Sequence, residues 1–382
     1  MNNRKAKVMG VVAAAAVAFG ITIGPAYAAY APGSRPTWTA NGIVYSIAVQ
    51  GDRVYIGGAF NRLTDPVTGS TVSRNHLAAF DVVTGDLITD FAPSTDGPVR
   101  AVAVSADGSE VLFGGNFTTV NGSPHLDLAA TDRSGDLVPG WDTSANKTVK
   151  DLLTVGDDVY AAGVFNKVGS QTHLGLAKLS VATGAVDPTW SPTATGGRPR
   201  ALYPAPDGVD LLVAGAFTTI NGNPRPYLAS LDLATGADTG WAPMPVCDTC
   251  DAFDVVTDGT NVYAGVGGGS GGRVAAWSAT ASDKPLWIDH GDGNVQSVAV
   301  RDGVVYAGGH FGPSFMNSTR HQLAAVNASN GALLPWNPVL GGNDYPGVWA
   351  ISAGPDFLRI GGGFTSIGGV AQARYAESVP PE

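Results

Sequence analysis

The sequence has few cysteines and few basic residues, and each shortage excludes a class of protein. Two cysteines in 382 residues cannot support a disulfide-dense miniprotein. Lysine and arginine number 22 against 32 acidic residues, which gives a formal charge of −10. This balance argues against general nucleic-acid or anionic-membrane binding, which needs a basic surface. Only 14 % of residues are charged, but 44 % are hydrophobic, which is enough for a core and excludes a disordered tail.

The sequence signatures of several enzyme classes are also missing. The chain has no Gly-x-Ser-x-Gly elbow, no His-Glu-x-x-His zinc motif and no phosphate-binding loop. Glycine is abundant instead, with 52 residues beside 25 prolines. An enzymatic function is therefore left open, and a function without catalysis is favoured.

Residues 1–28 have the pattern of a secretory signal peptide. A start that is rich in Lys and Arg precedes an apolar run over 11–23, and Ala26-Tyr27-Ala28 forms a small-x-small cleavage site. The alternative is a membrane anchor, but the run is short for a bilayer. Cleavage after Ala28 would leave 354 of the 382 residues and change the formal charge from −10 to −13. We expect a secreted, extracellular protein with no membrane span after the signal is removed.

One unit recurs along the rest of the chain. Its marker is a strand that ends in Gly-Gly-x-Phe or Ala-Gly-x-Phe, and it occurs at 57–60, 114–117, 162–165, 214–217, 308–311 and 361–364, with a degenerate copy at 263–268. The average spacing is about 51 residues, in the range of propeller repeats. Seven units of this size fill the mature chain.

Each unit has the same internal order. An alternating strand such as 99–104 leads through an Asp-Gly turn into the Gly-Gly-x-Phe strand. A polar loop, a third strand such as 77–81 and a Thr-Gly turn follow, and a last strand carries an aromatic residue. These aromatic residues are Phe91, Trp141, Trp190, Trp241, Trp287 and Trp336. Four short strands per unit predict an all-β fold, a seven-bladed β-propeller of four-stranded blades.

The two ends of the repeat region complement each other. The seventh unit stops at Arg374-Tyr375-Ala376 before its last strand, and an unmatched Trp38 precedes the first unit. We expect a strand near Trp38 to complete the last blade and close the ring, because closure removes the open sheet edge. An open solenoid is the alternative. The expected domains are a lead-in at 29–37, the propeller at 38–376 and a tail at 377–382.

Two motifs resemble known propeller families. The runs at 114–122 and 214–222, Gly/Ala-Gly-x-Phe-Thr-Thr-Val/Ile-Asn-Gly, resemble the delta-60-type repeat of secreted bacterial β-propellers. The "Leu-Ala-x-Leu-Asp…Thr-Gly…Trp" half is similar to the repeats of quinoprotein-like propellers. The resemblance covers about 38–376 and implies a propeller architecture. The quinoprotein likeness implies a quinone-dependent redox site.

One column of the aligned first strands differs in chemistry from unit to unit. Its members are Tyr45, Arg100, Lys150, Arg200, Phe253, Gln296 and Trp349. Because first strands line the channel of a propeller, the column predicts a basic arc facing an aromatic arc at one channel mouth. Arginine binds carboxylates and phosphates, and aromatic faces stack on sugars or apolar surfaces. We expect an acidic glycan or a protein ligand to bind there, although packing between blades is the alternative.

The best acidic pair is Asp151 and Asp254, in the next column of the first strands. A glycosidase needs two converging carboxylates, so these two are the alternative catalytic residues. No cofactor and no histidine metal site are expected, because the histidines before the third strands have unequal offsets. Two acidic clusters leave Ca²⁺ as an alternative; their members are Asp248, Asp251, Asp254, Asp289 and Asp292.

Cys247 and Cys250 are the two cysteines, three positions apart. In a secreted chain we expect them to form a local disulfide. A thioredoxin-like redox site needs a helix start in a βαβ unit, which the sequence does not predict.

These observations favour a monomeric, exported propeller that acts as a binding scaffold. A carbohydrate-active or quinone-dependent enzyme using Asp151 and Asp254 is the alternative. A structural protein of the cell envelope or matrix is the third.

Overall fold

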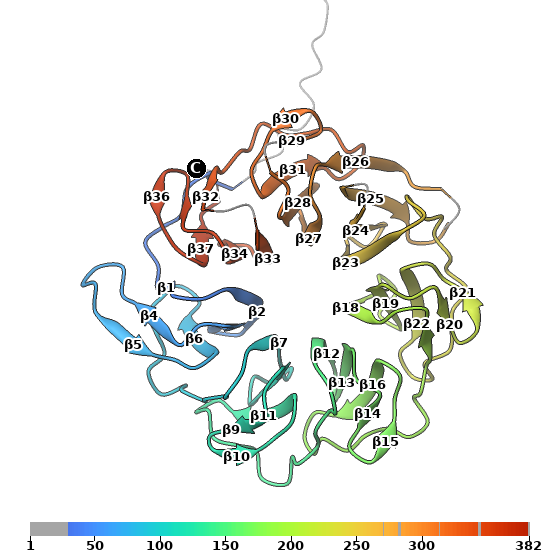
Figure 1. Ribbon diagram of the computed structural model, residues 1–382, viewed down its shortest axis with the longest axis horizontal. Helices are drawn as coiled ribbons and strands as arrows, with labels where there is room; N and C mark the ends of the chain where they lie inside the picture. The colour runs from blue at the N-terminus through green and yellow to red at the C-terminus, as the bar shows by residue number, and fades with distance from the viewer. Residues whose placement is uncertain (1–29, 270, 282–283, 313, 343–344, 381–382) are drawn as a thin grey trace, which may run out of the picture.

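The fold is all-β in the computed structural model, which describes residues 30–380 apart from 270, 282–283, 313 and 343–344. Small antiparallel sheets lie around a central axis. The larger ones have their first strand nearest that axis, and short hairpins such as β9–β10 lie at the outer edge (Figure 1). This arrangement is consistent with the blades of a β-propeller. In the described part of the chain, no helix is long and apolar enough to cross a membrane. The expected signal peptide lies outside the described residues.

Three sets of strands build the sheets from the axis outward. The inner strands are β2 (Val44–Gln50), β7 (Val99–Val104), β12 (Val149–Val155), β18 (Pro199–Pro204), β23 (Cys250–Thr257), β27 (Val295–Arg301) and β33 (Val348–Ala353). The middle strands are β3 (Arg53–Gly58), β8 (Glu110–Gly115), β13 (Asp158–Gly163), β19 (Asp210–Gly215), β24 (Asn261–Gly268), β28 (Val304–Gly309) and β34 (Leu358–Gly362). The third strands are β6 (Leu77–Asp81), β11 (Leu128–Asp132), β16 (Leu176–Ser180), β22 (Leu228–Asp232), β25 (Gly272–Ser278), β31 (Leu323–Asn327) and β37 (Tyr375–Ser378).

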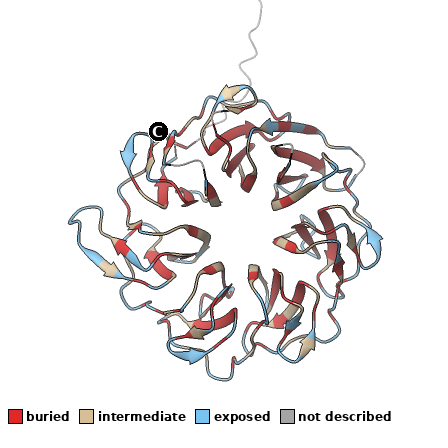
Figure 2. Ribbon diagram, in the orientation of Figure 1, coloured by how far each residue is buried: buried red, intermediate tan, exposed pale blue. Residues whose placement is uncertain are grey.

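Shorter strands complete the outer part of the molecule. They are β1 (Thr39–Ala40), β4 (Arg62–Thr64), β5 (Thr71–Ser73), β9 (Thr119–Val120), β10 (Ser123–Pro124), β14 (Lys167–Val168), β15 (Gln171–Thr172), β17 (Ala194–Thr195), β20 (Thr219–Ile220), β21 (Asn223–Pro224), β26 (Trp287–Gly291), β29 (Ser314–Phe315), β30 (Ser318–Thr319), β32 (Leu340–Gly341), β35 (Ser366–Ile367) and β36 (Val370–Ala371). Most form hairpins in the polar loop that follows a middle strand, and β26 links β25 to β29 in a six-stranded sheet. Their tips are exposed, while burial concentrates in the strands behind them (Figure 2).

The expected fourth strand is mostly reduced to a single bridge. The bridges Phe80↔Leu87, Thr131↔Leu137 and Leu179↔Val186 are examples, and β26 is the regular exception. Proline just before the tryptophan explains part of this in some units, as at Pro139 and Pro188. Proline lacks the N–H that a continued ladder needs.

The turns after β6, β11, β22 and β31 are each held by the acidic or amide side chain that ends the strand. Asp81 Oδ1 accepts hydrogen bonds from Val83 N at 2.9 Å and from Thr84 N at 2.8 Å. Asp132 and Asp232 play the same part in their units. The glycine that follows, such as Gly85 with φ +75°, takes the left-handed conformation that the turn requires.

The first glycine of the Gly-Gly pair lets neighbouring sheets approach closely. A Cβ on Gly114 would lie 2.5 Å from Cγ1 of Val149, which begins the inner strand of the next sheet. Gly57 faces Val99 in the same way, at 2.7 Å. The recurring glycine is therefore a packing device between sheets.

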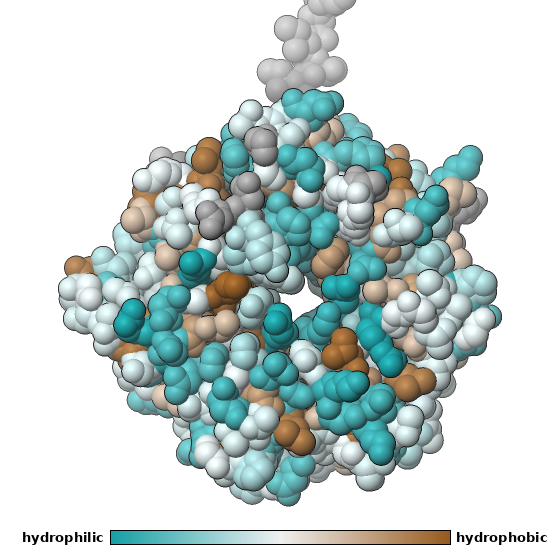
Figure 3. Space-filling view, viewed as in Figure 1, coloured by the Kyte–Doolittle hydropathy of each residue, from teal (hydrophilic) through white to brown (hydrophobic). Residues whose placement is uncertain are grey.

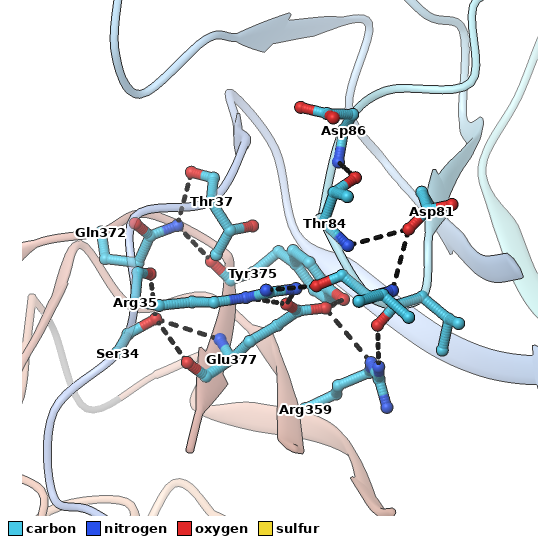
Figure 4. Close-up of polar contacts among 12 residues, drawn as sticks. Ser34, Arg35, Thr37, Asp81, Thr84, Asp86, Arg359, Gln372, Tyr375 and Glu377 are labelled. Carbon is cyan, nitrogen blue, oxygen red and sulfur yellow. Dashed lines mark hydrogen bonds and ion pairs between the residues drawn. The ribbon is translucent and has the colours of Figure 1, made fainter. Parts of the chain in front are cut away.

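The two ends of the described chain lie against each other. Arg35 forms an antiparallel bridge with Glu377 of β37, and Ala31 N donates to Val379 O at 2.8 Å. The carboxylate of the fully buried Glu377 accepts hydrogen bonds from Arg35 Nε at 2.7 Å, from Arg359 Nε at 3.2 Å and from the Tyr375 hydroxyl (Figure 4). The pairing occurs three residues before Trp38, in the lead-in, and involves the tail.

Candidate functional site

Every inner strand carries a β-bulge near its start. The register against the middle strand skips one residue in each, between Val44 and Ser46 in β2 and between Val149 and Asp151 in β12. The skipped residues are Tyr45, Arg100, Lys150, Arg200, Phe253, Gln296 and Trp349. This set, the bulge residues, is the column that the sequence alignment singles out. A bulge bends its strand and re-aims the extra side chain.

All of the bulge residues line one cavity of about 450 Å³. An opening lies at the centre of the molecule, with hydrophilic residues around much of it (Figure 3). Asp151, Asp254, Ser46 and Ser297 line the same cavity. The bulge explains why Lys150 and Asp151, consecutive in sequence, share one cavity, because regular strand residues would alternate between faces.

The cationic side of the cavity comes from three adjacent inner strands, β7, β12 and β18. The Arg100 guanidinium lies 4.4 Å from the ring centroid of Tyr45. The Arg200 guanidinium lies 4.7 Å from the ring centroid of Phe253 and forms an ion pair with Asp251. Each arginine is thus oriented by an aromatic face, and Arg200 is also held through its Nη2 by Asp251.

Lys150 lies between these two arginines in strand order. Partial burial and, to a smaller extent, the charges of Arg200 and Arg100 together lower the pKa of its ammonium to about 8, against the opposing effect of Asp251. A lysine in such a position loses its proton more easily than an exposed one.

The opposite side of the cavity is aromatic and amide in character. The rings of Tyr45 and Trp349 meet edge to face, with centroids 5.6 Å apart. Gln296 is only 5 % exposed, and its Oε1 has no hydrogen-bond partner among the described residues. Trp349 Nε1 is likewise a buried atom without a hydrogen-bond partner among them. A buried polar atom without a partner costs free energy, so both atoms are suited to meeting a polar group of a ligand.

Asp151 and Asp254 join neighbouring inner strands. Asp151 Oδ2 accepts a hydrogen bond from Leu202 N of β18 at 2.7 Å, and Asp254 Oδ2 accepts one from Val298 N of β27 at 2.8 Å. Burial raises the pKa of Asp151 to about 7, with the charge of Asp254 adding to it. Burial also raises the pKa of Asp254 to about 6. Both carboxyl groups therefore have a structural role, since each links two neighbouring inner strands, in addition to any role in chemistry.

Sequence reasoning missed two kinds of residue at the site. Ser46 belongs to the Asp151 column, and its Oγ accepts a hydrogen bond from Val102 N at 3.1 Å, another link between inner strands. Asp251 was considered only as a calcium ligand, whereas it pairs with Arg200 on the neighbouring strand. The sequence feature that could have identified Asp251 as a site residue is its position directly after Cys250, at the start of β23.

The cysteine prediction is confirmed. Cys247 and Cys250 form a disulfide with a Cα–Cα distance of 5.8 Å, at the start of β23. Cys250 is adjacent to Asp251, so the disulfide lies beside the cationic side of the cavity.

Calcium remains a prediction. In residues 30–380, outside the gaps, no group of three or more His, Cys, Asp or Glu side chains has the arrangement of a metal site. Asp289 is buried with an Oδ2 that lacks a partner among the described residues, and Asp292 Oδ2 accepts a hydrogen bond from Ser314 N at 3.2 Å. His76 is hydrogen-bonded to Thr95, while His125 and His173 are buried in other units.

Comparison with known proteins supports the propeller architecture. Residues 206–232 match a family described as a domain of unknown function (DUF5122) beta-propeller. A search of curated proteins found no match. The crystal structure of the computationally designed Ika8 protein is similar, with a TM-score of 0.52 and 14 % identity, over 91 % of this chain and 100 % of that one. At this identity the likeness concerns the fold alone. The chain is thus similar to β-propeller repeat proteins in both sequence and structure.

Proposed function

We propose that the chain is a closed, seven-bladed β-propeller. Each inner strand packs against the next, from β2 through β7, β12, β18, β23 and β27 to β33, and β33 packs against β2. The bridge between Arg35 and Glu377 supports closure by the lead-in segment. The proposed propeller therefore extends beyond 38–376 at both ends.

We infer that the protein is an exported, monomeric binding scaffold whose site is the channel mouth. The observation that carries this is the gathering of all bulge residues around one cavity, with three cations facing aromatic rings. The net charge of −10 makes such a cationic cluster unusual on this chain. The chemistry suits an acidic glycan or an acidic segment of a protein: arginine and lysine bind its carboxylates, while Tyr45 and Trp349 cover its apolar faces.

A glycan and anionic-polymer array tests this proposal. The protein is compared with a variant that carries Arg100→Ala, Lys150→Ala and Arg200→Ala, and with a control variant, Lys167→Ala, whose lysine is exposed on an outer hairpin. We expect acidic ligands to bind the protein and the control but not the triple variant. Equal binding to all three would contradict a site at the channel mouth. A blank array with folded proteins would shift the proposal to a protein ligand or to a structural role in the envelope.

The enzyme alternative rests on Asp151 and Asp254, whose raised pKa values keep a carboxyl proton available near neutral pH. Their hydrogen bonds to Leu202 and Val298 account for their position without catalysis. Incubating array hits with the protein distinguishes the two functions. Product release that Asp151→Asn abolishes would favour a carbohydrate-active enzyme, and binding without turnover would favour the scaffold.

A further inference from the structure

Lys150 differs from the other cations of the cavity because its side chain has no hydrogen-bond, ion-pair or aromatic partner among the residues that the structure describes. Arg100 is placed over Tyr45, and Arg200 is held by Phe253 and Asp251. Lys150 forms no hydrogen bond or ion pair with another described residue, although it lines the cavity. Lys178, on an outer strand, shows the usual arrangement: its Nζ lies 3.0 Å from Asp158 and 3.8 Å from Asp187. The amine of Lys150 is therefore exposed to whatever occupies the cavity.

We propose that Lys150 is a reactive amine that forms an imine with a small 2-oxo acid, whose carboxylate is bound by Arg100 and Arg200. The inference rests on the proposed anion site and adds a covalent step to it. The three side chains occupy the same bulge position on adjacent inner strands and line one cavity, and the charges of both arginines act on the Lys150 ammonium. A 2-oxo acid carries the two groups that such a cavity would bind: a carboxylate for the arginines and, bonded directly to it, a carbonyl carbon for the amine.

The step balances without an outside oxidant or reductant. The lone pair of neutral Lys150 Nζ attacks the carbonyl carbon, the C=O π electrons move to oxygen, and one nitrogen proton passes through solvent to that oxygen to give the carbinolamine. The hydroxyl then leaves as water with the second nitrogen proton, again relayed by solvent, as the nitrogen lone pair forms the C=N bond. The reaction is reversible, and the net change is one amine plus one carbonyl giving one imine plus one water.

The electrostatic setting favours this chemistry. A neighbouring cation and partial desolvation are the known means of making a lysine nucleophilic near neutral pH. Both are present here, and they lower the pKa of Lys150 to about 8. A carboxylate bound by the arginines would offset part of the positive charge that lowers the pKa of Lys150. The amine is therefore most reactive in the cavity before the carboxylate is bound.

Reductive trapping tests the inference. The purified protein is incubated at neutral pH with pyruvate or glyoxylate and sodium cyanoborohydride, and each lysine peptide is followed by mass spectrometry. We expect the Lys150 peptide to be labelled more than about tenfold faster than that of the exposed Lys167. Lys150→Arg, which keeps the charge but not the nucleophile, should abolish this fast labelling. Lys167→Arg should leave it unchanged.

Two comparisons separate this inference from the proposed function. With methyl pyruvate, which lacks the carboxylate, the preference for Lys150 over Lys167 should be smaller than with pyruvate, and excess lactate should compete with pyruvate. If acidic ligands bind on the array but Lys150 is labelled no faster than Lys167, the imine is refuted and the anion site stands. If Lys150 is labelled equally fast by pyruvate and methyl pyruvate, the role given to the arginines is overturned.

Discussion

Asp151 shows, at the scale of one residue, how a side chain in the channel ties stability to pH. Its pKa in the folded protein is about 7, whereas an aspartate in an unfolded chain has a pKa of about 3.9. Between these values the folded state binds more protons than the unfolded state. The contribution of Asp151 to the free energy of unfolding is therefore full below about pH 4 and is lost as the pH rises to about 7.

Replacing Asp151 by Asn should therefore flatten the dependence of stability on pH. Asn cannot ionise, so relative to the unchanged protein the variant should gain stability steadily from about pH 4 to pH 7. Urea unfolding at a series of pH values measures this. Asp65→Asn is the matched control: its exposed carboxyl has a pKa lowered by hydrogen bonds from Thr68 and Val67, so its profile should change only at acidic pH. Parallel profiles for Asp151→Asn and the unchanged protein would refute the raised pKa.

The sequence predicted the bulge residues as a set but not their partners. Aligning the repeats identifies equivalent positions, and deviation from the repeat marks a candidate site. The ion pair of Arg200 with Asp251 joins different strands through side-chain geometry that the alignment does not contain. A bulge turns both Lys150 and Asp151 into the cavity, but no particular residue type in these strands marks it. A prediction from the regular alternation of strand faces would therefore place one of the two side chains on the wrong face.

At the scale of the element, the contact between a middle strand and the next inner strand depends on a missing side chain. Gly114 of β8 faces Val149 of β12, and an added Cβ would overlap the valine. Gly114→Ala should cost about 1–3 kcal/mol in the free energy of unfolding, because the core must shift to accept the methyl group. Denaturant unfolding measures the loss.

A second substitution makes this prediction specific. Val149→Ala should recover part of the loss in Gly114→Ala, because it removes Cγ1, at 2.5 Å, one of the two Val149 atoms that the new Cβ meets; the Cβ of residue 149, at 2.6 Å, remains. Gly269→Ala is the control, since nothing lies within 4 Å of its added Cβ. Additive effects of Gly114→Ala and Val149→Ala would contradict the proposed contact.

The element order was predictable from sequence, but the regularity of the fourth strand was not. Glycine, phenylalanine and alternating valine mark the first three strands in nearly every unit. In the sequence the fourth strand is marked only by its aromatic residue. The packing of that side chain, and not a ladder of backbone hydrogen bonds, holds the surrounding chain in place. Trp141, for example, is fully buried and donates from Nε1 to Val181 O at 2.8 Å.

At the scale of the whole molecule, the ends of the chain are held together by a buried ionic cluster. Glu377 is fully buried and binds Arg35 and Arg359. These two arginines donate to Val83 O at 2.6 Å and Val82 O at 3.0 Å, in the turn that follows β6 of the first sheet (Figure 4). The cluster thus joins the lead-in, the first sheet and the last sheet. Sequence reasoning expected this junction from the unfinished last unit, but the charged residues that form it carry no repeat signal.

Glu377→Ala should destabilise the protein by about 3–5 kcal/mol, because it leaves the buried Arg359 without its carboxylate. Asp52→Ala, which breaks the exposed ion pair with Arg133, is the control and should cost far less, because solvent screens an exposed pair. Thermal and denaturant unfolding of both variants give the comparison. Equal losses would show that the junction at Glu377 does not hold the two ends together.

The central claim is that the bulge residues form an anion-binding channel mouth, and calorimetric titration with an acidic oligosaccharide tests it most directly. Oligogalacturonate is titrated into the protein and into the variant carrying Arg100→Ala, Lys150→Ala and Arg200→Ala, with a neutral oligosaccharide of equal length as reference. We expect the acidic ligand to bind the protein at least about 100-fold more tightly than the variant, a difference of about 3 kcal/mol. Equal affinity for the two proteins would contradict the claim, as would a preference for the neutral ligand.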